Sequence, residues 1–205
     1  MNGMELLLAS TNPHKLREVR EILEPLGISV QGLDSLNESF PEPVEDSDTF
    51  SGNAKIKAVE YARVTGRRCI ADDSGLVVDA LGGKPGVLSA RFSGLGSNSE
   101  ERDAANNVLL LKLMKDVPAN KRSARFVCAI CIADPDGTIV TQTTGTFEGV
   151  IGTAPCGKNG FGYDPLLFVP EANKTSAQMT PEEKNERSHR GEAVRKFAKV
   201  VRDMC

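Results

Sequence analysis

The sequence of 205 residues has little of what would mark a membrane, secreted or nucleic-acid-binding protein. No apolar run approaches the roughly 18 residues needed to cross a bilayer. Residues 1–10 lack the basic start and long apolar stretch of a signal peptide, so we expect a cytoplasmic protein with no membrane partner. The net charge of −3 argues against a stable complex with nucleic acid held by bulk charge.

Cysteine and histidine are too few and too scattered for a disulfide framework or a zinc site. The five cysteines are an odd number, and His14 and His189 are the only histidines. Cys128 and Cys131 have the spacing of a redox or zinc pair. However, the β-branched and aromatic content of residues 125–133 predicts a strand, on which residues three apart point to opposite faces. We therefore expect Cys128 and Cys131 to behave as small buried hydrophobes. The five are Cys69, Cys128, Cys131, Cys156 and Cys205.

Strand and helix signals alternate early in the chain, and a hairpin follows late. No repeat, low-complexity tract or Pro/Ser-rich linker divides the sequence, so we expect one domain over residues 1–205. The pattern predicts an α/β fold in which helices flank an elongated mixed β-sheet, with two lobes around a central nucleotide cleft. The expected strands are 5–9, 28–33, 69–78, 123–134 and 138–147, and the expected helices are 13–26, 49–65, 99–115, one beginning at Thr180 and one from about Gly191.

The first candidate site follows the first expected strand. A short polar loop leads into a helix that Asn12 caps, with Pro13 at its first position. Such a helix start presents backbone N–H groups and the positive end of its dipole to an anion, and Lys15 can reach the same anion. The alternative is a capped helix with a solvated lysine. No Walker A motif or well-placed GxGxxG sequence competes for a phosphate. The full segment is Ser10, Thr11, Asn12, Pro13, His14 and Lys15.

The second candidate is the pair Asp72 and Asp73, followed by Ser74 and Gly75. Adjacent carboxylates in apolar surroundings are costly unless they bind a cation or find donors, and paired carboxylates suit Mg²⁺. We expect Gly75 to turn the chain and leave Asp73 at an exposed strand end. The alternative is a polar turn in which the aspartates cap backbone groups. Glu45 adds a carboxylate in the preceding loop.

Lysines and aromatic residues supply the remaining candidates. Lys57 lies on one helix face with Asn53 and Glu60, where it would neutralise a phosphate or simply be solvated. The glycine-rich segment 157–165 lets the backbone approach a ligand, and Phe161 or Tyr163 could stack on a base.

Lys184 and the run Ser188, His189 and Arg190 place several hydrogen-bond donors close together in the sequence. These donors suit the carbonyl edge of a purine. Taken alone, they also fit the solvated start of a basic helix.

Taken together and in order, these segments resemble the inosine/xanthosine triphosphate pyrophosphatase family. The resemblance extends from the first strand to the last helix. The segments that carry it are Ser10–Asn12 with Lys15 and Glu18, Asn53–Lys57, Ile70–Leu76, Pro85-Gly86 with Ser89–Arg91, Gly160–Pro165 and Ser188–Gly191.

The resemblance implies an elongated α/β homodimer that uses Mg²⁺ to release pyrophosphate from dITP, ITP and XTP. It implies that Ser10–Lys15 contact the triphosphate, with Lys57 as a further phosphate-side residue, and that Ser74 contacts the substrate. Asp73 would accept a proton and bind the metal, with Glu45 and Asp72 as further metal-side candidates. The residues that would hold the base and sugar are Phe161, Gly162, Tyr163, Asp164, Lys184, His189 and Arg190.

Two other functions stay open at this point. A Maf-like pyrophosphatase acting on dTTP, UTP or modified pyrimidines would share the opening strand, polar loop and helix. A non-catalytic nucleotide sensor would bind the same ligands, although the Asp72–Asp73 pair counts against it. The basic C-terminal helix is less typical of nucleic-acid binding, because acidic residues interrupt it.

Overall fold

The computed structural model describes residues 4–36 and 38–202, and for 201–202 it describes the backbone alone. Cys205 therefore lies outside the described residues. The chain divides into two compact units, each built from separate stretches of sequence. We call these the first unit (residues 1–73, 128–145 and 189–205) and the second unit (residues 74–127 and 146–188).

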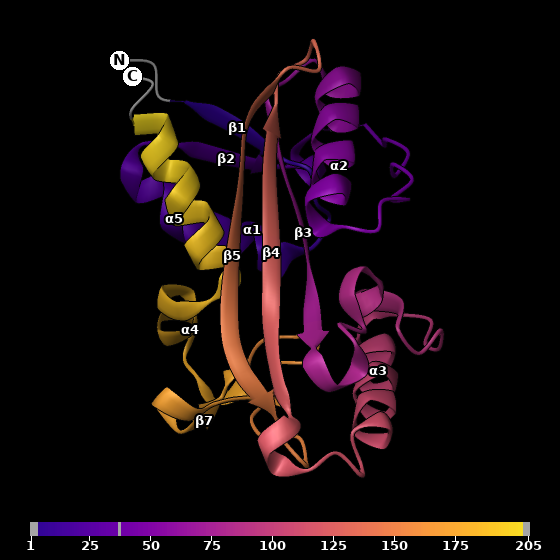
Figure 1. Ribbon diagram of the computed structural model, residues 1–205. Helices are drawn as coiled ribbons and strands as arrows, with labels where there is room; N and C mark the ends of the chain where they lie inside the picture. The colour runs from indigo at the N-terminus through magenta and orange to yellow at the C-terminus, as the bar shows by residue number, and fades with distance from the viewer. Residues whose placement is uncertain (1–3, 37, 203–205) are drawn as a thin grey trace. The chain divides into compact units, whose positions relative to one another are not determined.

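The strands form one mixed sheet, as the sequence predicts (Figure 1). Its order within the described residues is β2-β1-β3-β4-β5-β6-β7. β1 pairs in parallel with β2 and β3, whereas β6 pairs antiparallel with β5 and β7. The strands are β1 (Glu5–Leu8), β2 (Ser29–Gly32), β3 (Cys69–Val78), β4 (Ser123–Ala133), β5 (Ile139–Ile151), β6 (Leu167–Val169) and β7 (Lys174–Thr175).

The helices begin at the capping residues that the sequence indicates. Asn12 and Thr49 accept hydrogen bonds from the first turns of α1 and α2, and Thr180 forms a capping box with Glu183 at the start of α4. No helix in the described part of the chain is long and apolar enough to span a membrane. The helices are α1 (Pro13–Leu23), α2 (Phe50–Thr65), α3 (Ser99–Leu113), α4 (Pro181–Arg187) and α5 (His189–Arg202).

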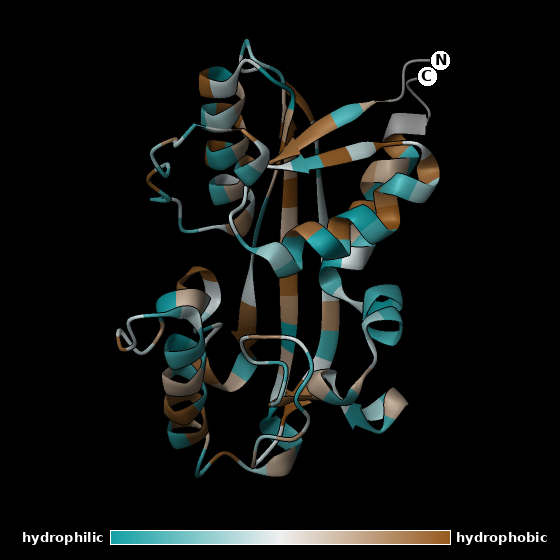
Figure 2. Cartoon of the chain, turned by 180° about the vertical axis from the view of Figure 1, so that it is seen from behind, coloured by the Kyte–Doolittle hydropathy of each residue, from teal (hydrophilic) through white to brown (hydrophobic). Residues whose placement is uncertain are grey.

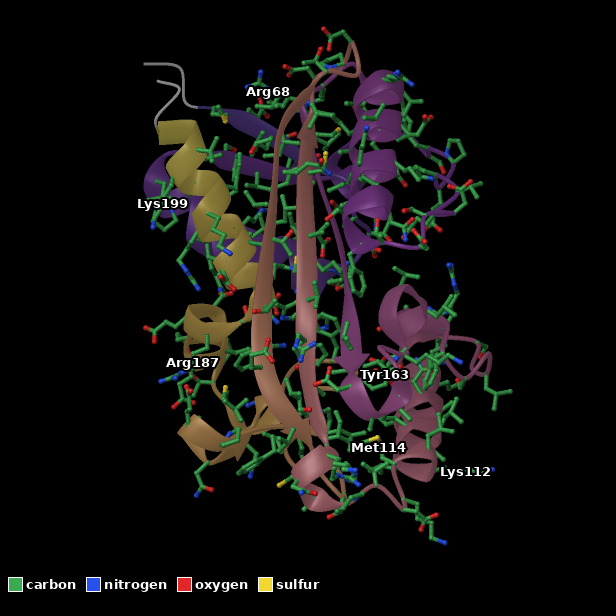
Figure 3. All side chains as sticks on the ribbon, viewed as in Figure 1. Arg68, Lys112, Met114, Tyr163, Arg187 and Lys199 are labelled. Atoms are coloured by element: carbon green, nitrogen blue, oxygen red, sulfur yellow. The ribbon has the colours of Figure 1, made fainter. Side chains whose placement is uncertain are left out.

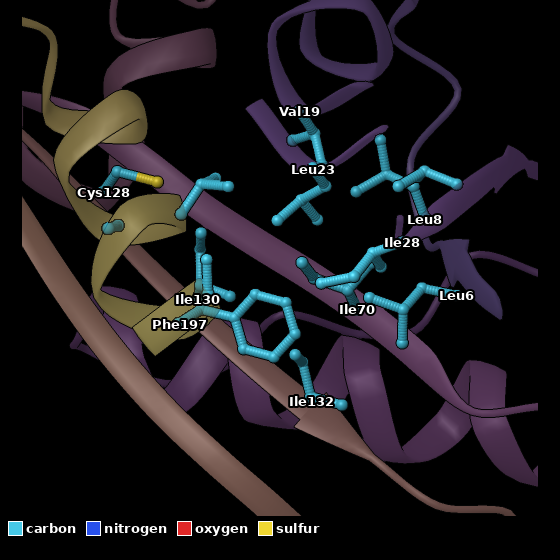
Figure 4. Close-up of a cluster of buried hydrophobic side chains, with 14 residues drawn as sticks. Leu6, Leu8, Val19, Leu23, Ile28, Ile70, Cys128, Ile130, Ile132 and Phe197 are labelled. Atoms are coloured by element: carbon cyan, nitrogen blue, oxygen red, sulfur yellow. The ribbon is translucent and has the colours of Figure 1, made fainter. Parts of the chain in front are cut away.

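In the first unit, apolar side chains cover both faces of the sheet. One face packs against α1 and α5 (Figure 4), and the other packs against α2. Cys128 lies on the first face and Cys131 on the second, so the prediction that these two thiols point apart is confirmed. Burial raises the pKa of Cys128 to about 12 and that of Cys131 to about 11. Neither thiol is therefore a ready metal ligand or nucleophile.

The second unit has a core of its own between α3 and its strands. Tyr163 and Met114, labelled in Figure 3, belong to this core. Figure 2, coloured by hydropathy, shows both polar and apolar residues along the helices. This mixture is expected of helices that bury one side and expose the other. The buried Arg122 donates to the carbonyls of Met114 and Ile151, at 2.6 and 2.7 Å, and so ties the end of α3 to β5.

Gly75 does not turn the chain, and this expectation was wrong. β3 continues to Val78, and Asp73 is buried, with 8% of its surface exposed, rather than at an exposed strand end. A Cβ at Gly75 would lie 2.3 Å from the Ser89 hydroxyl oxygen. That hydroxyl accepts a hydrogen bond from the Leu76 amide at 2.8 Å. Gly75 is thus needed for the close approach of Ser89, not for a bend.

Candidate active site

The first unit brings its charged residues to the carboxyl end of parallel strands. The chain passes from β1 to β2 on one side and then returns to β3 on the other side of β1. Leu8 pairs with Ile70, so the loop after β1 and the pair Asp72 and Asp73 on β3 lie just beyond this register. In open α/β sheets, ligands bind where the strand order reverses in this way.

Asp72 and Asp73 point to opposite faces of β3. Side chains alternate along a strand, and the contacts of the two residues follow that alternation. Asp72 contacts groups on α1 and α5, whereas Asp73 contacts groups on α2. Although adjacent in sequence, the two carboxylates therefore have different surroundings and different chemistry.

Asp72 lies in a buried network of four charges. Its Oδ2 atom is 3.0 Å from the Lys15 ammonium and accepts hydrogen bonds from Arg190 Nε and Nη2 at 3.2 and 3.0 Å. Arg190 Nη1 also donates to Glu18. Burial alone would raise the pKa of Asp72, but Lys15, Arg190 and Lys57 outweigh it and hold that pKa well below its usual range.

The surroundings of Asp73 stabilise its charged form less than those of Asp72 do. Asn53 donates to its Oδ2 at 3.2 Å, and the Lys57 ammonium lies 3.6 Å from its Oδ1. Burial raises the pKa of Asp73, and Lys57 and Asn53 offset this only in part, while Glu45 raises it further. Asp73 thus holds a proton more readily than an ordinary aspartate, as a proton acceptor in a reaction should.

The predicted anion site at the start of α1 needs a correction. Pro13 has no N–H, and the His14 and Lys15 amides donate to Asn12 Oδ1 at 2.9 and 3.4 Å. The first-turn amides are therefore taken up by the cap. What this segment offers a phosphate is the Lys15 charge, the helix dipole and the hydroxyls of Ser10 and Thr11. The exposed His14 ring pairs with Arg17 at 3.1 Å.

Glu45 and Asp73 are arranged to share one cation. The Lys57 ammonium lies 3.3 Å from Glu45 and 3.6 Å from Asp73, so both carboxylates converge on a positive group. Burial lowers the pKa of Lys57, but Asp72, Asp73 and Glu45 outweigh this and raise it. Oxygen donors of this kind fit a hard divalent cation.

Asp72 does not fit the metal role that the family resemblance implies. Its Oδ2 already accepts from two cations, and it faces away from Asp73 and Glu45. Within the described residues, no three His, Cys, Asp or Glu side chains lie close enough together to hold a metal ion. The contacts of Asp72 instead place it among the groups that hold Lys15 and Arg190 in position.

The second unit contains a separate polar cluster centred on Asp164. Its Oδ2 accepts from Lys184 Nζ at 2.6 Å and from the Phe161 amide at 2.9 Å, and its Oδ1 accepts from Ser176 at 2.7 Å. A Cβ at Gly160 would lie 2.0 Å from the same carboxylate. Lys184 is thus a buried, ion-paired residue and not the solvated start of a helix.

Phe161 and Tyr163 have different roles. Tyr163 is 4% exposed, and its hydroxyl donates to the Ser89 carbonyl at 2.9 Å, so it anchors the loop and offers no stacking surface. Phe161 is half-buried, and the Lys184 ammonium lies 5.1 Å from its ring centroid. Of the two aromatic candidates, only Phe161 has a ring placed to meet a ligand.

Arg190 lies inside the network around Asp72. Its guanidinium is fully buried and donates to Asp72 and Glu18, so it holds these two carboxylates in place, and its contact with a base stays a prediction. His189 is buried in the first turn of α5, and Ser74 is half-buried on β3. Glu60 is exposed and forms an ion pair with Arg63. Sequence reasoning missed Ser176, which has no motif around it.

Ion-paired carboxylates and lysines at the carboxyl end of parallel strands define an α/β protein built to bind a phosphorylated ligand. The chain belongs to the Ham1 family, whose model matches residues 6–200. A dITP/XTP pyrophosphatase of Exiguobacterium sp. (strain ATCC BAA-1283 / AT1b) is 49% identical over 194 residues, 95% of each chain. One from Thermus thermophilus is 45% identical over 203 residues, 99% of this chain and 94% of the relative.

Solved structures agree with this assignment. A HAM1 protein from Coxiella burnetii superposes with a TM-score of 0.85 at 38% identity and covers 98% of this chain and 99% of its own. The Ham1 protein of Staphylococcus aureus gives a TM-score of 0.84 at 35% identity, covering 98% of this chain and 100% of its own. The α/β fold predicted from the sequence is thus confirmed.

The two aspartates should affect stability in opposite ways. In Asp72→Asn, two buried cations lose a counter-charge, and the free energy of unfolding at pH 7 should fall by about 3–5 kcal/mol. Since folding lowers the pKa of Asp72, its contribution is present above about pH 4 and is lost below it, so the difference from the wild type should shrink in acid. Since folding raises the pKa of Asp73, Asp73→Asn should be as stable as the wild type at pH 7 or more so.

Urea unfolding between pH 3 and pH 8 measures all three proteins. Glu60→Gln is the matched control, because its carboxylate is exposed on α2 and should change stability by less than about 0.5 kcal/mol. A wild-type unfolding curve for Asp72→Asn at pH 7 would contradict the proposed network.

Proposed function

We propose that this protein hydrolyses deaminated purine nucleoside triphosphates, namely dITP, ITP and XTP or dXTP, to the nucleoside monophosphate and pyrophosphate. Such an activity keeps these bases out of DNA and RNA. Membership of the Ham1 family supports the reaction. The observation that supports assigning the reaction to particular residues is the separation of Asp72 and Asp73 on opposite faces of β3. Asp73 thereby has a raised pKa and lies beside Lys57, which also pairs with Glu45.

The residues of the first unit would act on the triphosphate. Asp73 would orient a water molecule and take up its proton as the water oxygen bonds to the α-phosphorus. The bond between the α-phosphorus and its bridging oxygen then breaks, and pyrophosphate leaves. Lys15 and Lys57 would offset the charge on the leaving group, with Ser10 and Thr11 as hydroxyl donors.

Glu45 and Asp73 would hold a divalent cation, for which we propose Mg²⁺. When bound, the ion would neutralise phosphate charge and lower the pKa of a coordinated water. Lys57 occupies the position between these carboxylates in the structure, so we expect its ammonium to shift toward the phosphates when the ion binds.

Residues around the Asp164 cluster, together with His189, would recognise the base. Phe161 would stack on it, and Lys184 would donate to the oxygen at position 6 of hypoxanthine or xanthine. An ammonium group has no acceptor, so it could not pair with the 6-amino group of adenine, which is itself a donor. His189 is a further proposed donor, Ser74 a proposed substrate contact, and Asp164 and Gly162 shape the loop.

A substrate panel tests the proposal directly. Release of pyrophosphate and nucleoside monophosphate is measured side by side for dITP, XTP, dATP, dGTP and dTTP with Mg²⁺. We expect fast turnover of dITP and XTP alone, and loss of activity with EDTA. Preference for dTTP would instead indicate a Maf-like pyrophosphatase. Binding of dITP without turnover would indicate a nucleotide sensor.

Asp73→Asn tests the proposed base. The kcat for dITP should fall by about 10² to 10⁴-fold at saturating Mg²⁺, because the amide cannot take up a proton. Binding of dITP, measured by calorimetry, should be largely retained. Glu60→Gln on the neighbouring helix serves as the control and should keep wild-type kinetics. Near-normal turnover by Asp73→Asn would assign the base to another residue.

We also propose that the protein is a cytoplasmic homodimer. The proposal rests on the family resemblance, and exposed apolar side chains of the second unit, among them Leu88, Leu95 and Val108, are compatible with it. Sedimentation velocity should therefore give one species of twice the chain mass. A monomer at micromolar concentration would overturn this proposal without affecting the proposed reaction.

A further inference from the structure

Helix α3 holds one residue of the Phe161–Asp164 loop by both ends of its backbone. Asp103 Oδ2 accepts the Gly162 N–H at 2.7 Å, and Asn107 Nδ2 donates to the Gly162 carbonyl at 2.9 Å. All of these residues belong to the second unit. Asp103 and Asn107 are four residues apart and so lie one above the other on the same helix face.

This double contact fixes a residue that has unusual conformational freedom. Gly162 has φ of +61°, in the left-handed region, and a Cβ there would meet nothing within 4 Å. Glycine is therefore needed for its backbone angle and not for lack of space. Ordering a glycine costs more conformational entropy than ordering other residues, and two hydrogen bonds to Gly162 offset this cost.

The clamp determines how Phe161 is presented. The peptide that joins Phe161 to Gly162 contains the N–H that Asp103 accepts, so the clamp restrains that peptide directly. On the other side, Asp164 accepts the Phe161 N–H. Both peptides that flank the Phe161 side chain are thereby held by carboxylates, which leaves the ring as the loop's contact surface.

Stability of the helix does not account for Asn107. Asparagine is a poorer helix former than alanine, because its side chain competes for backbone hydrogen bonds. Its Oδ1 atom is buried and accepts no hydrogen bond from any residue that the structure describes. Asn106, by contrast, uses both ends of its amide, since it donates to the Ser89 carbonyl and accepts the Ser93 N–H. The donation to Gly162 is thus the one contact that distinguishes Asn107 from a better helix former.

We propose that Asp103 and Asn107 are positioning residues for base recognition. They fix the Gly162 backbone and so place Phe161 against the base, and through it they set the preference for deaminated purines. This inference rests on the proposed function and deepens it.

The kinetics of Asn107→Ala and Asp103→Ala test the inference. Loss of one hydrogen bond should raise the KM for dITP by about 3- to 10-fold, with kcat within about twofold. The ratio of kcat/KM for dITP to that for dATP should fall by a similar factor. Asp103→Asn keeps an acceptor for the Gly162 N–H and should restore both values. Asn107→Ala should unfold at the wild-type urea concentration or above it.

Asn98→Ala provides the matched control. Asn98 caps α3 through its contact with the Glu101 N–H and does not touch the loop. Its loss should lower the urea concentration at which the protein unfolds and leave the KM and the dITP/dATP ratio unchanged. Equal kinetic changes in Asn98→Ala and Asn107→Ala, or unchanged kinetics in both clamp variants, would overturn the inference. A wild-type protein inactive on dITP would instead overturn the proposed function itself.

Discussion

The alternation of side chains along β3 is the constraint on which the candidate active site depends. Because neighbouring residues of a strand face opposite ways, Asp72 and Asp73 are separated by the sheet although they are joined by one peptide bond. Asp72 meets α1 and α5, and Asp73 meets α2. One dipeptide therefore supplies a carboxylate to each face, and each can be tuned by a different helix.

The two faces of the sheet stabilise the two carboxylates to different degrees. Greater stabilisation of the charged form favours a structural role, and weaker stabilisation favours proton exchange. On one face, Lys15 and Arg190 make the charge of Asp72 nearly permanent, which suits a residue that holds other groups in place. On the other face, Asp73 is buried with partners that satisfy it only in part. A carboxylate so placed is costly to the folded state, and that cost is typical of groups that exchange protons.

Local features of this fold could be predicted from the sequence, because their causes are local. Asn12 and Thr180 cap helices through neighbouring amides, and β-branched and aromatic residues predict the strand that contains Cys128 and Cys131. The roles of Arg190 and Tyr163 could not be predicted in this way. Each is decided by a partner far along the chain: Glu18 is 172 residues from Arg190, and Ser89 is 74 residues from Tyr163.

Gly75 illustrates a different limit. A glycine after polar residues is typical of a turn, and the sequence offers no sign that the hydroxyl of Ser89 will occupy the space where a Cβ would be. The contacts of Asp103 and Asn107 could not be predicted for a similar reason, since both residues bond to the backbone of Gly162 and not to a side chain. Motifs record the side chains that carry chemistry, whereas the residues that hold those side chains in place leave no pattern.

Both units solve the problem of burying a carboxylate, but by different means. Asp72 is neutralised by two long, positively charged side chains, Lys15 and Arg190. Asp164 is satisfied by one lysine, one hydroxyl and one backbone amide, so its charge also fixes the main chain. An ion-pair network can adjust when a charged substrate arrives, because its members can exchange partners. A carboxylate bonded to the backbone cannot adjust without moving the loop. The first arrangement would suit the proposed binding of phosphates, and the second would suit the proposed selection among bases by shape and hydrogen bonding.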